Sequence, residues 1–299
     1  MTIAELIKLA IQFSMSLIIF CVALDSRFSD IVFLWRRPGL LLRSLVSMLV
    51  VMPAFAVLMA MWLDLSPAVE LALVASALAP VPPILPGKQI KAGGDSPFVV
   101  GLLTITALVA IVYVPLIATL IGEIFHRPVE VSIVSIAKVV ATSIVLPVLA
   151  GMAVRRWCPA LARRIDKPLS ILATGALVLA CIPIVIQEYP DMGRLLGNFS
   201  ILAMVAFALF GLAVGHWLGG PEPGDRSVLA MATASRHPAV ALVITHNATD
   251  RPGVMAAVLL SLLVGSIVTV PYVKWRRHRD VAATASSAKA RPQSGSGSP

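Results

Sequence analysis

The sequence predicts an all-α polytopic membrane protein of about ten transmembrane helices, arranged as two inverted five-helix repeats with two broken crossing helices. Of its 299 residues, 58% are hydrophobic and only 13% are charged, whereas soluble domains carry about 45–50% and about 25%. The mean hydropathy is +0.92, and the apolar residues form runs of about 20, the length that crosses a bilayer. In two stretches, prolines and cations interrupt this pattern.

Apolar runs bounded by charges, Pro or Gly predict eight regular helices. They cover residues 7–25, 39–62, 67–80, 96–122, 130–154, 168–187, 197–219 and 252–274. With two further interrupted stretches, ten crossings use roughly 200 residues, which leaves only short loops.

The interrupted stretches are residues 80–94 and 226–247. A proline removes a backbone donor and clashes with the preceding turn, so the four prolines of the first stretch cannot all lie in one straight helix. Pro238 predicts a second break between two helical halves. We therefore expect two broken helices, one late in each half of the chain.

The two halves resemble each other at an offset of 130 residues. Lys8 and Lys138 each begin an apolar span that leads to a basic loop and then to a proline. This predicts one transmembrane domain over residues 1–276, with repeats at about 1–125 and 126–276. Inverted repeats with interrupted helices are typical of secondary transporters.

Lys and Arg lie mostly at the span ends, where they set orientation. In a ten-span arrangement 14 lie on one side and 7 on the other, which predicts an integral protein of the plasma or inner membrane with both termini in the cytoplasm. Residues 277–299, rich in Ala, Ser, Gly and Pro, predict a disordered cytoplasmic tail. One conflict remains, because four arginines then lie outside: Arg27, Arg36, Arg37 and Arg43.

Three ionisable residues fall in the broken stretches: Lys88, Arg236 and His237. At bilayer depth such a group costs about 2.5–3.5 kcal/mol on insertion scales, so it usually faces a cavity or a partner. Neither stretch holds a carboxylate, so we expect a net positive pocket where the breaks meet, with Gln89 and Ser235 beside it. The alternatives are that the two cations reach headgroups or a distant acid, and that His237 makes a structural hydrogen bond.

Other chemistries have no support in the sequence. Metalloprotease, nucleophile-elbow, P-loop and dinucleotide-binding motifs are absent, which predicts that the chain is not an enzyme and needs no cofactor. The three cysteines have neither metal-site nor disulfide spacing. The cations are not clustered with aromatic residues, which argues against a nucleic-acid partner.

The segments APVPPILPGKQIKAGGD and SRHPAVAL resemble the two crossing helices of the bile acid:sodium symporter family, and the resemblance extends over nearly the whole chain. It implies ten helices, a panel domain, a core domain in which two broken helices cross, and sodium-driven uptake of organic anions.

One departure from the family pattern concerns sodium. Typical sodium-coupled members carry a Ser-Asn pair at the first break, where this chain has Leu85 and Pro86. They carry a Glu and a Gln-Asn pair at the second, where this chain reads ASRHP over residues 234–238. We therefore do not expect the usual sodium ligands, which leaves backbone carbonyls as candidates. The cationic side chains are expected to substitute for the ion, with transport that is sodium-independent, proton-linked or an exchange.

The sequence thus predicts a secondary transporter that moves a small organic anion across the lipid bilayer by alternating access. Its predicted substrate contacts are Lys88, Gln89, Ser235, Arg236 and His237. One alternative is a related carrier that exports its substrate by proton exchange. Another is a membrane sensor or scaffold that binds a ligand at the broken helices without transporting it.

Overall fold

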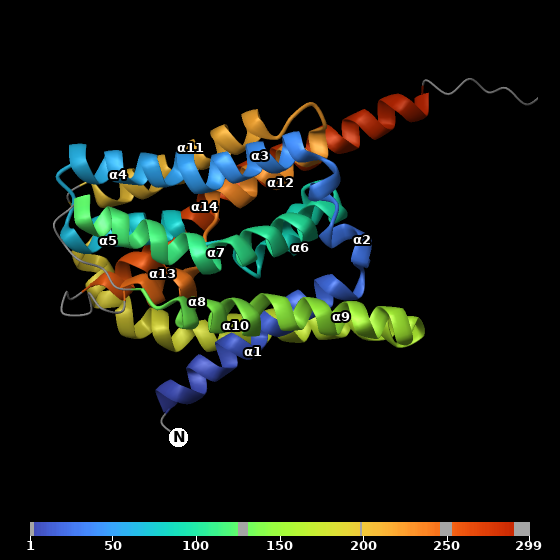
Figure 1. Cartoon of the computed structure of the whole chain (residues 1–299), viewed down its shortest axis with the longest axis horizontal. Coiled ribbons are helices and arrows are strands. Elements are labelled where there is room, and N and C mark those ends of the chain that lie inside the picture. The colour runs from blue at the N-terminus through green and yellow to red at the C-terminus, as the bar shows by residue number, and fades with distance from the viewer. Residues whose placement is uncertain (1–2, 125–130, 198, 246–252, 290–299) are drawn as a thin grey trace, which may run out of the picture.

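The computed structural model describes residues 3–124, 131–197, 199–245 and 253–289, and every regular element in these ranges is helical. Most helices run in a common direction (Figure 1). The α-helices are α1 (Ile3–Leu24), α2 (Phe28–Ile31), α3 (Pro38–Leu45), α4 (Met52–Trp62), α5 (Pro67–Leu78), α6 (Leu85–Lys91), α7 (Ser96–Ile124), α8 (Ile133–Val140), α9 (Leu146–Trp157), α10 (Pro159–Arg194), α11 (Ser200–Leu218), α12 (Pro223–Ala234), α13 (Pro238–Thr245) and α14 (Val254–Lys289). A short 3-10 helix, η1 (Leu34–Arg36), precedes α3, and two π-helical segments, η2 (Val46–Val51) and η3 (Ala141–Val145), join α3 to α4 and α8 to α9.

Eight segments are long and apolar enough to cross a membrane, and the pair α5 and α6 adds one more. The 12 residues of α5 rise about 18 Å, short of the roughly 30 Å of a hydrocarbon core. Together with α6, this half-helix makes a single crossing. Counted in this way, the described chain has nine candidate crossing segments, and the predicted ten, which gave residues 67–80 and 80–94 a crossing each, is not confirmed.

Nine is an odd number, so the chain enters and leaves at opposite ends of the bundle. In Figure 1, α1 begins on the left and α14 ends on the right, so the predicted placement of both termini in the cytoplasm is not confirmed. The loop between α1 and α3, which holds Arg27, Arg36 and Arg37, now lies at the same end as the basic turn between α9 and α10. This removes the conflict with the positive-inside rule.

The two breaks are not separated by 130 residues, the offset at which the two halves of the sequence resemble each other. That offset would place the counterpart of the first break inside α11, whereas the second break follows α12. The helix α14 continues through Lys289, whereas the predicted disordered tail begins at residue 277. Residues 290–299 lie outside the described residues.

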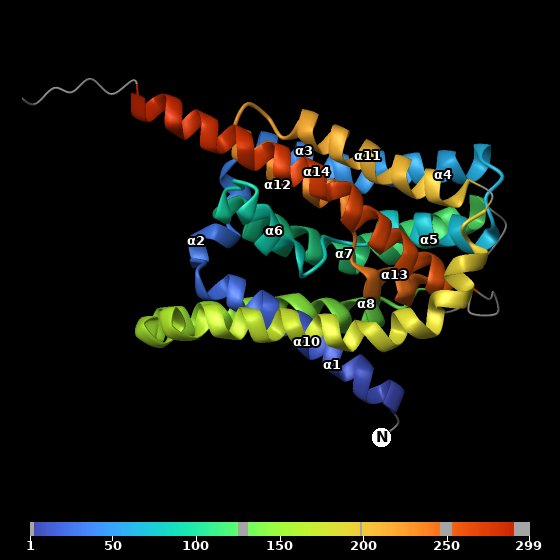
Figure 2. The ribbon, with the colours of Figure 1, turned by 180° about the vertical axis from the view of Figure 1, so that it is seen from behind.

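The helices form two layers (Figures 1 and 2). The first, which we call the panel layer, contains α1, α8, α9 and α10, with α1 packed on both α9 and α10. The second, the core layer, contains α3 to α7 and α11 to α14. Here α11 packs on α12 and α14, and α5 packs on α4, α13 and α14.

Glycines allow α11 and α12 to pack backbone against backbone. A Cβ atom on Gly211 or Gly215 would lie 2.8 or 2.5 Å from the Cα atoms of Ala234 and Ala230. Small residues at a four-residue spacing are a common way for membrane helices to approach closely. This contact fixes α12 up to Ala234, its last residue, and so fixes the position of the second break.

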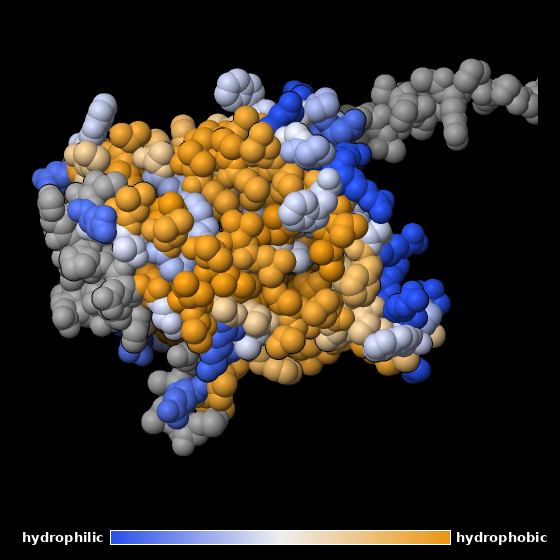
Figure 3. Space-filling view, viewed as in Figure 1, coloured by the Kyte–Doolittle hydropathy of each residue, from blue (hydrophilic) through white to orange (hydrophobic). Residues whose placement is uncertain are grey.

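The outer surface has the polarity of a membrane protein. Figure 3 shows a broad apolar belt between two more polar ends, with most of the hydrophilic surface at the right-hand end. On α10, large apolar side chains such as Ile171 and Ile186 are 75% and 68% exposed. Lipid would cover them, as expected for an integral membrane protein.

Candidate transport site

The first break lies between α5 and α6, where residues 79–84 have no helical hydrogen-bonding pattern. Prolines at 80, 82 and 83 remove three donors from this segment. At the other end of α6, Gly93 adopts φ 78°, a left-handed conformation that favours glycine. The Gly94 N–H donates to the Gln89 carbonyl at 2.9 Å, which closes this half-helix.

The second break separates α12 from α13. Ser235 is extended, with φ −114° and ψ 138°, and Pro238 is the first residue of α13. Proline is well suited to that position, because the first helical N–H would have no partner and the preceding residue is driven out of the helical region. The break predicted from this proline is therefore confirmed.

The two breaks contact each other directly. The backbone N–H of His237 donates to the carbonyl of Pro80 at 2.8 Å, and Nη1 of Arg236 donates to the carbonyl of Ala79 at 3.3 Å. On either side of this point α12 packs on α6 and α13 packs on α5. The broken helices therefore cross in the middle of the core layer.

Arg236 is the buried charge at this crossing. The residue is 6% exposed, and its Nη2 donates to the carbonyl of Met48 at 3.3 Å. No carboxylate neutralises it within the described ranges, where the ion pairs are Arg37–Asp225, Arg155–Asp25 and Arg194–Asp191. A cation of this kind, held only by neutral carbonyls, attracts an anion.

Met48 belongs to the π-helical segment η2, which our sequence analysis missed. The Met52 N–H donates to the Ser47 carbonyl, five residues back. If this pattern continued, the N–H of residue 53 would donate to the Met48 carbonyl. Residue 53 is a proline, however, and has no N–H. Pro53 thereby leaves the Met48 carbonyl free for Arg236, and the neighbouring Leu49 carbonyl accepts the Tyr113 hydroxyl.

The panel layer repeats this arrangement in η3. The Leu146 N–H donates to the Ala141 carbonyl, again five residues back, and Pro147 leaves the Thr142 carbonyl without its helical donor. That carbonyl accepts the Ser16 hydroxyl of α1 at 2.9 Å. The signal in the sequence is a proline in the middle of an apolar span, which frees a carbonyl for a donor on another helix.

The other predicted site residues have different environments. Lys88 is half-buried on α6 and forms no ion pair within the described ranges. Gln89 is buried, and its Nε2 donates to the Val228 carbonyl of α12 at 2.8 Å, so it links the two broken helices. Its Oε1 and both ring nitrogens of buried His237 have no hydrogen-bond partner among the described residues.

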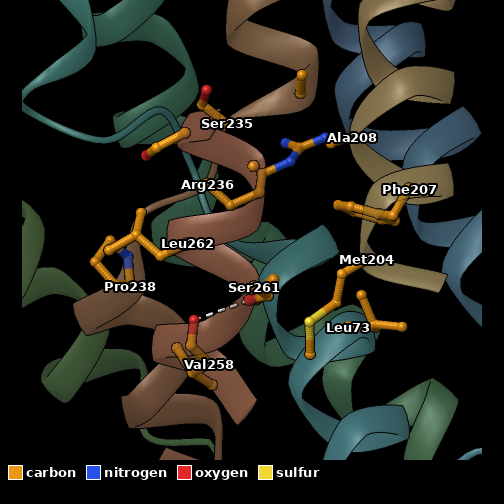
Figure 4. Close-up of a pocket in the computed structure, with 14 residues that line it drawn as sticks. Leu73, Met204, Phe207, Ala208, Ser235, Arg236, Pro238, Val258, Ser261 and Leu262 are labelled. Atoms are coloured by element: carbon orange, nitrogen blue, oxygen red, sulfur yellow. Dashed lines mark hydrogen bonds between the residues drawn. The ribbon is translucent and has the colours of Figure 1, made fainter. Parts of the chain in front are cut away.

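Ser235 and Arg236 line a small cavity inside the core layer (Figure 4). The cavity measures about 40 Å³, and α5, α11 and α14 supply most of its other walls. Lys88, Gln89 and His237 do not line it. The structure therefore places Ser235 and Arg236 at one cavity and His237 at the crossing beside them, whereas Lys88 and Gln89 lie farther along α6.

The first break also touches the panel layer. Ile84 packs against an apolar cluster that includes Ile18 of α1 and Leu177 of α10. The crossing is thus linked to both layers, so a displacement of one layer against the other would change the surroundings of the first break.

Comparison with known proteins gives one family. Residues 12–190, more than half of the chain, match the Sodium Bile acid symporter family. The chain belongs to this family. No individual curated protein matches it. The matched range contains the first break and both π-helical segments, whereas the second break, with Arg236, lies beyond it.

Membership in the sodium bile acid symporter family makes this chain a relative of sodium-coupled solute transporters and a membrane protein. Sodium is bound through oxygen atoms, as other hard cations are. The freed carbonyls of Ala79 and Met48 are such oxygens, but both accept hydrogen bonds from the Arg236 guanidinium.

Proposed function

We propose that this member of the sodium bile acid symporter family moves a small organic anion by alternating access, with Arg236 supplying the positive charge that a bound sodium ion would otherwise bring. The observation that carries the proposal is the buried guanidinium at the crossing, hydrogen-bonded to Ala79 and Met48 and paired with no carboxylate of the described chain.

Electrostatics argue against a sodium ion beside this guanidinium. Two unit charges 4 Å apart repel by about 4 kcal/mol at an effective dielectric constant of 20. That energy raises the dissociation constant for sodium by a factor of about 1,000. The same field favours an anion, and the second cation, Lys88, adds to it from α6.

The substrate contacts that we propose are Lys88, Gln89, Ser235, Arg236 and His237. A buried polar atom without a partner costs about 1–3 kcal/mol. The oxygen of Gln89 and the ring nitrogens of His237 carry this cost in the described chain. A polar ligand at the crossing would satisfy them and gain that energy on binding.

Alternating access fits the two layers. The core layer carries both broken helices, and Ile84 connects them to the apolar cluster on α1 and α10. We propose that the panel layer and the core layer move against each other around the crossing. The crossing then faces one side of the membrane and afterwards the other.

We further propose that four pairs of crossing segments are related by an inverted repeat. Partners lie five crossings apart, and an odd separation gives them opposite directions through the membrane. The pairs are α1 with α10, α3–α4 with α11, α5–α6 with α12–α13, and α7 with α14. In this scheme α8–α9 has no partner in the described chain.

The orientation follows from the cations. The right-hand end in Figure 1 has the basic turn between α9 and α10 and the cationic end of α14, whereas the α4–α5 turn at the other end has Asp64 and no cation. The positive-inside rule therefore places the right-hand end, with the C-terminal helix, in the cytoplasm and the N-terminus outside.

Cys158 provides a native probe of this orientation, because it is exposed at the α9–α10 turn. We expect a membrane-impermeant maleimide to label it in inside-out vesicles and not in intact cells. The control is Cys158→Ser combined with Asp64→Cys, which should reverse the result. Labelling of Cys158 in intact cells would contradict the proposed orientation.

The transport proposal is tested by uptake into proteoliposomes with a panel of organic anions selected by thermal shift. We expect uptake that persists when sodium is replaced by potassium on both sides, and a drop of at least about tenfold for Lys88→Met, equivalent to about 1.4 kcal/mol. Strict sodium dependence together with a fully active Lys88→Met variant would overturn the substitution of sodium by cationic side chains. Ligand binding without flux would favour the sensor instead.

A further inference from the structure

The cavity beside Arg236 is too small for an organic substrate. Its volume is about 40 Å³, which has room for about three water-sized particles. Pockets for organic ligands measure about 300–1,000 Å³. Whatever occupies this cavity therefore consists of a few atoms at most.

The wall of the cavity has several hydrogen-bond donors without a partner among the described residues. Three hydroxyls of the lining, those of Ser76, Ser235 and Ser266, take part in no hydrogen bond in the described part of the chain. A fourth, that of Ser261, donates to the Val258 carbonyl at 2.8 Å (Figure 4). The Nε–H of Arg236 is buried and also has no partner there.

No acidic residue lines the cavity. The partners of the guanidinium are two neutral carbonyls, and a charge removed from water costs several kcal/mol when nothing of opposite sign lies near it. A water molecule would satisfy the hydroxyls but would leave the charge uncompensated. A small anion satisfies both, because it accepts N–H and O–H donors from every side.

We propose that this cavity binds one inorganic anion of halide size, chloride under physiological conditions, which neutralises Arg236 in the substrate-free transporter. The ion would sit inside the core layer among Ser76, Ser235 and Ser266, with the guanidinium as its charged partner. The organic substrate proposed above contacts the crossing through a larger set of residues, so this inference goes beyond the transport proposal.

The test measures binding of radioactive chloride to the full, detergent-purified chain in potassium sulfate, without any organic anion. We expect saturable binding with one ion per chain, competition by bromide, and a higher unfolding temperature in potassium chloride than in potassium sulfate of equal ionic strength. The Ser76→Ala variant is expected to weaken chloride binding about tenfold, and Ser266→Ala by a similar factor.

Ser14→Ala is the matched control, because Ser14 is also buried but lies on α1 in the panel layer. It should leave chloride affinity unchanged. Absence of saturable binding would show that only water fills the cavity and would overturn the proposal. Binding that is unaffected by both Ser76→Ala and Ser266→Ala would also overturn it, by placing the ion elsewhere. Neither result bears on uptake of organic anions, which is measured separately.

Discussion

Replacing Arg236 by glutamine is expected to lower uptake of the organic anion in proteoliposomes by at least about 100-fold, equivalent to about 2.7 kcal/mol. Glutamine is polar and fits within the volume of the arginine side chain, so we expect the fold to tolerate it. It has no charge, however, and the anion loses the cation that we propose as its main electrostatic partner. The measurement is initial uptake rate at equal amounts of reconstituted protein.

Two comparisons make this result specific to the buried charge. Arg194→Gln removes an arginine whose side chain is 81% exposed and paired with Asp191 in its own helix, so its uptake should match the wild type. Arg236→Lys keeps the charge but cannot reach both carbonyls in the same way, and we expect intermediate activity. Wild-type uptake by Arg236→Gln would refute the proposed role of the guanidinium.

Replacing Gly215 by alanine is expected to destabilise the core layer strongly. The added Cβ would lie 2.5 Å from both the Ala230 Cα and the Leu229 carbonyl oxygen, so α11 and α12 must separate. Overpacking of this kind costs about 1–3 kcal/mol or more. We expect a lower unfolding temperature in detergent and a larger aggregated fraction on size exclusion.

Gly175→Ala is its matched control. Gly175 also lies inside a helix, α10, but nothing is within 4 Å of the position that its Cβ would take. Because alanine favours the helix by about 1 kcal/mol over glycine, this variant should be as stable as the wild type or more so. Equal unfolding temperatures for the two variants would mean that the close α11–α12 contact does not exist.

Much of the crossing could be predicted from the sequence because prolines act locally. Those at 80, 82, 83 and 238 interrupt their helices regardless of what surrounds them, and both predicted breaks are present. The predicted number of crossings is not confirmed, for a related reason. A run of apolar residues does not show whether it spans the bilayer alone or ends halfway, which depends on the neighbours available to its open end.

For the candidate site too, some features could be predicted from the sequence and others could not. Its residue types were visible in the sequence, because a cation in an apolar stretch without a carboxylate stands out. Their partners were not visible. Gln89 proves to link α6 to α12 through Val228, and the Met48 carbonyl is available only because η2 and Pro53 free it.

The sequence by itself determined that this chain is a helical membrane protein with two proline-broken segments and unneutralised cations, because hydropathy, proline and charge are properties of single residues. Only the tertiary structure decided that the two breaks touch, that α5 and α6 together make one candidate crossing, and that Arg236 is held by carbonyls 157 and 188 positions away along the chain. Contacts over such separations depend on how all the helices pack together, and no local pattern encodes them.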